Sequence, residues 1–228
     1  MNLVTVLQWI FAILFFVALL IHIKRLFPSN LSTRQLAYDA TFLAIILLMG
    51  FVPQMGYITI LPGLSLTLLP IPVILGSYLF KNKRGWLYGL FFGLTSWIVA
   101  LMNPVGFNAF FIYPWISLLP RLLFGLVSGF LFNILGKNPK MSRNAFLIGV
   151  TSFLLCGLHT LLVFGDLFIF YKDNILQLFL AKDILVEGLK LTFLGVILLG
   201  ALGEMILSGL LVPLIAKSII RFQEKKGK

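Results

Sequence analysis

The sequence predicts an all-α membrane protein with a core of six transmembrane helices and one additional N-terminal transmembrane helix. The chain has 228 residues, of which 60% are hydrophobic and only 11% charged. This is too little charge to cover the surface of a soluble domain of this size. Several runs also approach or exceed the ~17–25 apolar residues that cross a bilayer. We assign the additional helix to residues 1–30 and the six-helix domain to residues 31–228.

Seven hydrophobic segments define the predicted spans. They cover residues 3–23, 36–52, 64–80, 85–101, 112–135, 145–170 and 191–219. Pro70 and Pro72 interrupt the third segment, which indicates either a plain kink or the broken helix that often flanks a transporter site. Residues 174–190 are amphipathic, so we expect them to lie along the outer interface or to cap the bundle.

The basic residues predict the orientation, because they gather in alternate connections. These are Lys24, Arg25, Arg34, Lys81, Lys83, Arg84, Lys137, Lys140, Arg143, Lys217, Arg221, Lys225, Lys226 and Lys228. By the positive-inside rule, these positions predict a multi-pass protein of the cell membrane, with its N-terminus outside and its C-terminus in the cytoplasm. The net charge of +11 therefore reflects the topology of the chain and contact of its basic residues with lipid, and it does not indicate nucleic-acid binding.

The two outer connections at 53–63 and 102–114 are rich in Gly, Pro, Asn and aromatic residues. This composition favours a lid over an outward-facing pocket, and the alternative is an interfacial aromatic belt with ordinary turns. The candidate substrate contacts in and beside these connections are Gln54, Tyr57, Thr59, Asn103, Phe107, Asn108, Tyr113 and Trp115.

Ionisable residues inside spans supply further candidates, because charges are costly in lipid and mark the bundle interior. Arg121 lies in the outer half of its segment, and its planar guanidinium suits a carboxylate ligand; the alternative is a structural ion pair with Asp166 or Glu204. His159 and Asp166 are seven residues apart and share a helix face, so both are candidate substrate contacts. Asp39 is expected to reach the lipid headgroups.

No enzyme motif is present. The chain has neither a GxxxxGK[ST] phosphate loop nor an HExxH motif, and its single cysteine, Cys156, lies in an apolar run, so no metal or other cofactor is predicted. The enzymatic alternative is an intramembrane hydrolase in which Ser128 or Ser208 pairs with His159. The rhomboid-type GxSG lacks its first glycine, and small pairs such as Ser128–Gly129 more often allow close helix packing.

Three stretches together resemble the substrate-binding S component of an energy-coupling-factor (ECF) vitamin transporter. They are "VPQMGYI", "IPVILGSYLF…GWLYGLFFGLTS" and "PRLLFGLVSG", and the resemblance runs from Thr33 to the end of the chain. The additional N-terminal helix departs from the family pattern, whose core has six helices with both ends inside.

The resemblance implies a subunit that binds a vitamin or vitamin precursor with high affinity and hydrolyses no ATP itself. Its implied partners are two ABC-type ATPases and a transmembrane coupling subunit. The "ATFLA" stretch matches the family's AxxxA docking face, with Ala40 and Ala44 as the small pair that lets two helices approach closely. Pantothenate is the first choice of substrate, and cobalamin, folate and hydroxymethylpyrimidine remain alternatives.

Overall fold

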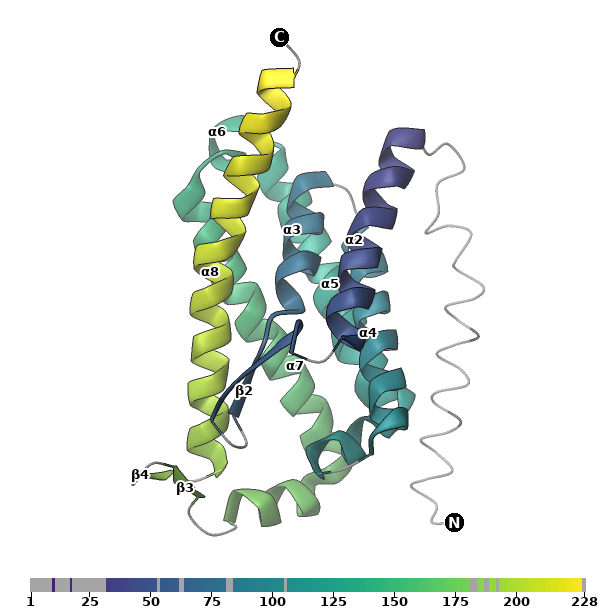
Figure 1. Cartoon of the computed structure of the whole chain (residues 1–228), viewed down its shortest axis with the longest axis vertical. Helices are drawn as coiled ribbons and strands as arrows, with labels where there is room; N and C mark the ends of the chain where they lie inside the picture. The colour runs from purple at the N-terminus through teal and green to yellow at the C-terminus, as the bar shows by residue number, and fades with distance from the viewer. Residues whose placement is uncertain are drawn as a thin grey trace.

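The described residues form a bundle of six long helices in a computed structural model of the chain (Figure 1). The described residues are 10, 17, 32–52, 54–61, 64–80, 84–104, 106–180, 184–186, 189–191 and 193–226. The predicted additional helix at residues 3–23 falls outside them, apart from two single positions. The long helices are α2 (Thr33–Phe51), α3 (Pro70–Phe80), α4 (Gly85–Met102), α5 (Pro114–Gly136), α7 (Ala145–Leu180) and α8 (Phe193–Lys226).

The six long helices confirm the predicted all-α membrane fold. Within the described residues, α4, α5, α7 and α8 are long and apolar enough to cross a membrane, whereas α2 and α3 are shorter apolar helices. The start of α2, the short helix α6 (Pro139–Ser142) and the end of α8 lie at one end of the bundle (Figure 1). The basic residues Arg84, Arg143 and Arg221 belong to this end.

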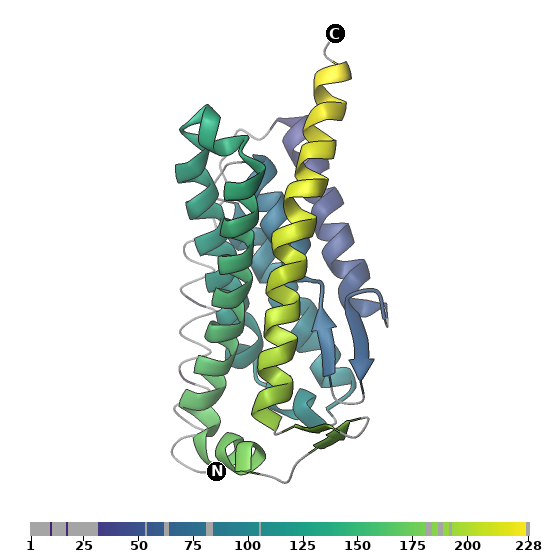
Figure 2. The ribbon, with the colours of Figure 1, turned by 90° about the vertical axis from the view of Figure 1, so that its left-hand side faces the viewer.

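The predicted span at 64–80 is wrong in its first part. Residues Leu64–Thr67 form strand β2, which pairs antiparallel with β1 (Tyr57–Leu61), and α3 begins only at Pro70. Proline is well tolerated in the first turn of a helix, where its missing N–H has no intrahelical partner. Figure 2 shows this hairpin lying beside α8, at the end of the bundle away from α6.

The outer connection at 102–114 folds into the 3₁₀ helix η1 (Gly106–Ile112). Two side chains attach η1 to the bundle: Trp97 Nε1 donates to the Ile112 carbonyl at 2.9 Å, and Ser117 Oγ donates to the Phe111 carbonyl at 2.6 Å. At the same end, α7 breaks its helical geometry at Tyr171, and its last turns lie across the bundle end (Figure 1). A short hairpin, β3 (Ile184–Val186) and β4 (Leu189–Leu191), follows.

Helices α4 and α5 form the closest contact of the bundle, and glycines make it possible. A Cβ atom added at Gly89 would collide with the backbone carbonyl of Arg121, and one at Gly125 would collide with the carbonyl of Gly85. Small residues allow such close backbone approach between helices in lipid. This contact fixes the position of the α5 backbone at Arg121.

Candidate functional site

A cavity of about 430 Å³ lies inside the hairpin end of the bundle. Its walls come from α4, α5, α7 and α8, together with the β1–β2 hairpin and η1. The lining residues are Tyr57, Thr67, Phe92, Ser96, Asn108, Phe111, Arg121, His159, Thr160, Val163, Phe164, Val196, Ile197, Gly200, Ala201 and Glu204. The volume lies within the ~300–1,000 Å³ range of small-molecule sites, and the mixture of apolar walls and a few polar groups is typical of them.

Arg121 is the buried cation of this cavity, with 6% of its surface exposed. Its position follows from Pro120. Proline has no N–H, so the carbonyl of Ile116, four residues earlier, has no helical donor. Arg121 Nη1 donates to this carbonyl at 3.2 Å and to the Ser117 carbonyl at 3.0 Å. The guanidinium also lies over the rings of Phe111 and Phe92, at 4.9 and 5.4 Å from their centroids, which is cation–π geometry.

Arg121 forms no ion pair within the described part of the chain, and the nearest compensation is a longer-range attraction to the buried carboxyl group of Asp166. The guanidinium forms an ion pair with neither Asp166 nor Glu204, and its Nε is buried without a hydrogen-bond partner. Of its five N–H donors, the two on Nη1 are the ones used. The structural ion pair considered as an alternative from the sequence is therefore absent here, and the remaining donors are available to an anion.

His159 is a second buried polar group of the cavity that has no partner. Its ring packs between Phe92 and Phe124, with centroids 5.2 and 5.1 Å apart. Neither ring nitrogen has a hydrogen-bond partner among the described residues. Since buried polar groups are normally satisfied, a ligand or a water molecule in the cavity is the natural partner. The pairing with serine required by the hydrolase alternative is not formed, and Ser128 donates instead to the Phe124 carbonyl at 2.8 Å.

The hairpin contributes Tyr57 and Thr67 to the cavity wall. The backbone N–H of Thr67 donates to Glu204 Oε1 on α8 at 2.6 Å, which attaches the hairpin to that helix. Tyr57 faces Thr67 across the two strands. Burial raises the pKa of the Tyr57 phenol above its ordinary value, so the hydroxyl stays protonated at neutral pH and can donate a hydrogen bond.

Four of the predicted substrate contacts line the cavity, namely Tyr57, Asn108, Arg121 and His159. The structure places five others away from it. Gln54 is exposed at a turn with a φ of 68°, and Asn103 is also exposed. Tyr113 stacks on Trp115 at 5.0 Å in an aromatic cluster that adjoins the cavity wall, but neither ring lines the cavity, and Asp166 is buried outside the lining. The side chains of Thr59 and Phe107 fall outside the described residues.

Sequence reasoning missed most of the apolar wall and part of the polar wall. The polar residues not included among the predicted contacts are Thr67, Ser96, Thr160 and Glu204. Only Glu204 gave a signal, as an acid in the middle of a span. Residues such as Val163 and Ile197 are indistinguishable in the sequence from lipid-facing positions.

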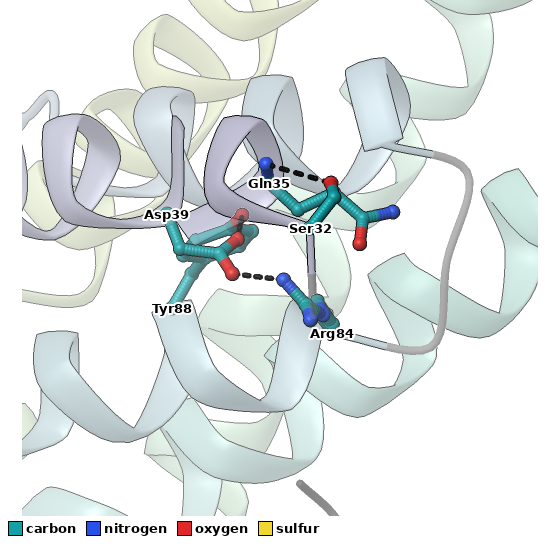
Figure 3. Close-up of polar contacts among 5 residues, drawn as sticks. All are labelled: Ser32, Gln35, Asp39, Arg84 and Tyr88. Carbon is teal, nitrogen blue, oxygen red and sulfur yellow. Dashed lines mark hydrogen bonds and ion pairs between the residues drawn. The ribbon is translucent and has the colours of Figure 1, made fainter. Parts of the chain in front are cut away.

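At the other end of the bundle, α2 has an exposed face that includes the alanine pair. Ala40 and Ala44 are both exposed, as are Leu48 and Ile45 beside them. The expectation that Asp39 reaches the headgroups is wrong, since only 5% of its surface is exposed. Asp39 forms an ion pair with Arg84 and accepts a 2.6 Å hydrogen bond from the Tyr88 hydroxyl (Figure 3).

Comparison with the sequences of known proteins places the chain in a family. A family model described as the ECF transporter, substrate-specific component, matches residues 34–216. The pantothenate transporter PanT of Leuconostoc mesenteroides subsp. mesenteroides is 33% identical over 109 residues, which cover 46% of this chain and 53% of that protein. The pantothenic acid transporter PanT of Lactococcus lactis subsp. cremoris is 28% identical over 123 residues, or 48% of this chain and 59% of that protein. The chain thus spans about half the length of the curated relatives it matches.

Proposed function

The chain belongs to the family of substrate-specific components of ECF transporters, and we propose that it is the subunit that binds pantothenate for import. Arg121 carries this proposal. A buried guanidinium that forms no direct ion pair among the described residues, and whose Nε has no partner, is unfavourable unless a ligand supplies a negative charge next to it. The carboxylate of pantothenate matches the fork of N–H donors that Arg121 leaves unused.

The cavity also supports pantothenate over two of the other substrates considered. Hydroxymethylpyrimidine has no carboxylate to neutralise Arg121. Cobalamin, with its corrin ring and nucleotide loop, exceeds a cavity of about 430 Å³. Folate carries carboxylates as pantothenate does, so the cavity alone does not separate these two substrates. The two relatives whose names specify pantothenate point to the same substrate.

The partner in the proposed transport cycle is an energy-coupling module of two ABC-type ATPases and a transmembrane coupling subunit. The exposed Ala40 and Ala44 face of α2 is the proposed docking surface, because small side chains let a second helix approach closely. In the proposed orientation, the cavity end of the bundle is outside. The basic end, with the C-terminus, is in the cytoplasm, where the ATPases lie.

The test compares two ligands that differ in one group: pantothenate and pantothenol, in which an alcohol replaces the carboxylate. Isothermal titration on the purified protein should give tight binding of pantothenate and binding of pantothenol weaker by at least about a hundredfold, as expected when a buried charge pair is lost. Arg121→Lys keeps the charge but loses the fork, so it should weaken pantothenate binding and preserve its advantage over pantothenol. Equal binding of the two ligands by the wild-type protein would refute the proposal.

A further inference from the structure

Glu204 is a second ionisable group in the same cavity. The role proposed for Arg121, which is to bind the carboxylate of the ligand, does not explain why Glu204 is there. It lies in the middle of α8, within a candidate membrane span, and lines the cavity. A carboxylate in such a position is costly and by default functional. It also has no cationic partner within the described residues, since the ion pair found there joins Arg84 and Asp39.

The hydrogen bonding of Glu204 is only partly used. The described residue that binds it is Thr67, whose backbone N–H donates to Oε1 at 2.6 Å and whose hydroxyl also interacts with the carboxylate. A carboxylate offers about four acceptor positions on its two oxygens. Acceptor capacity therefore remains on a group that borders the cavity, and a molecule with hydroxyl or amide donors can use it.

Arg121 and Glu204 stay separate although they share one cavity. Arg121 is fixed on α5 by the carbonyls of Ile116 and Ser117, and Glu204 is fixed on α8 by the hairpin. Opposite charges in a low-dielectric space attract each other strongly. Because each is held by its own hydrogen bonds, the cavity keeps a cationic region and an acceptor region for a ligand that reaches both.

We infer that Glu204 is a specificity-determining residue of this cavity, which accepts hydrogen bonds from the hydroxyl groups of a ligand whose carboxylate lies on Arg121. The inference rests on the proposed function and adds the second recognition point. Pantothenate has both kinds of group, with a carboxylate at one end and two hydroxyls at the other. Glu204 also accepts the hydrogen bond from Thr67. The group proposed to recognise the ligand therefore also holds the hairpin that forms part of the cavity wall.

The experiment uses pantothenate and its dideoxy analogue, in which both hydroxyls are replaced by hydrogen. Affinities are measured by isothermal titration on the purified full chain. The wild-type protein should bind the dideoxy analogue at least about tenfold more weakly, because hydrogen bonds to a charged acceptor are the stronger class. In Glu204→Gln, this ratio of dissociation constants should fall by roughly tenfold or approach one, while the amide oxygen still accepts from Thr67.

Two control variants locate the effect. Asp166→Asn removes a buried carboxylate that lies outside the cavity lining and attracts Arg121. Any change at Arg121 affects both ligands equally, so the ratio between them should stay at the wild-type value. Arg121→Lys should weaken both ligands by a similar factor and also preserve the ratio. If Glu204→Gln preserves the ratio as well, or if the wild-type protein binds both ligands equally, the inference is wrong while the proposed function stands. If the wild-type protein binds neither ligand, the proposed function and the inference both fall.

Discussion

Among the described residues, two arginines are buried, and they are compensated in different ways. Arg84 pairs with Asp39, which also accepts from Tyr88, so the charges are neutralised within the chain (Figure 3). Arg121 contacts two backbone carbonyls and two aromatic faces but forms no direct ion pair among the described residues. The first arrangement is complete without a ligand, whereas the second leaves donors for the ligand proposed above. Under the proposed function, this difference separates a structural end of the bundle from a binding end.

Removing the acid of the complete pair should have the largest effect on stability. Asp39→Ala leaves Arg84 buried without its counter-ion, and we expect a loss of about 3–5 kcal/mol. The melting temperature in detergent would fall accordingly. The double variant Asp39→Leu with Arg84→Met removes both charges and should recover most of the loss. A single variant that melts like the wild-type protein would show that this pair does not stabilise the fold.

Removing the uncompensated charge should affect affinity instead. Arg121→Gln takes away a cation that is unfavourable in the empty protein, so the melting temperature should stay level or rise slightly. Pantothenate affinity should fall by about 2–4 kcal/mol, the range for a broken buried charge pair. Thermal stability and titration are measured side by side. A Gln variant that is unfolded would make Arg121 structural, and one that binds at wild-type strength would remove it from the site.

The glycine contact links the α4 helix to the position of Arg121, and it can be disturbed by a single methyl group. Gly89→Ala places a Cβ against the Arg121 carbonyl, and overpacking of this kind costs about 1–3 kcal/mol. We expect both lower stability and weaker pantothenate binding, because α5 must shift. Gly165→Ala is the matched control, since an added Cβ there meets no atom within 4 Å. Identical behaviour of the two variants would show that α4–α5 spacing is not limiting.

The smallest effect on the isolated protein is expected at the exposed alanine face. Ala44→Leu should leave stability and pantothenate affinity unchanged but weaken assembly with the coupling module by about 1 kcal/mol or more, because bulk separates helices that must touch. Co-purification with the module measures this. Ala145→Leu, at an exposed position on α7, is the control for adding the same side chain elsewhere. Normal assembly of Ala44→Leu would contradict the docking role of α2.

The sequence predicts the helices well because bilayer thickness fixes the length of an apolar span. The sequence also indicates Arg121 and His159 as candidate substrate contacts, since a polar residue within a span is rare and marks the interior of the bundle. The hairpin was missed because "LSLTLLP" is as apolar as a helix, and its strand conformation depends on pairing with residues 57–61. Short apolar runs do not separate strand from helix by periodicity alone.

The wrong expectation for Asp39 has a different origin. A position near a helix end indicates contact with headgroups, but the residue that decides its environment is Arg84, which is 45 positions away. The sequence shows Glu204 as an acid within a span, but it does not show in which direction the side chain points. Its role depends on the rotation of α8 toward β2, and a single sequence does not specify how helices are rotated against each other.

Pro120 has a consequence for the energetics of ligand capture. By leaving the Ile116 carbonyl without a helical donor, it provides one of the two backbone acceptors that order the Arg121 side chain in the absence of a ligand. Ordering a free arginine side chain on binding would cost up to about 2 kcal/mol of conformational entropy. Here that ordering takes place during folding, so more of the charge–charge attraction is available as affinity. A missing backbone hydrogen bond in one helix therefore becomes preorganisation of the binding site.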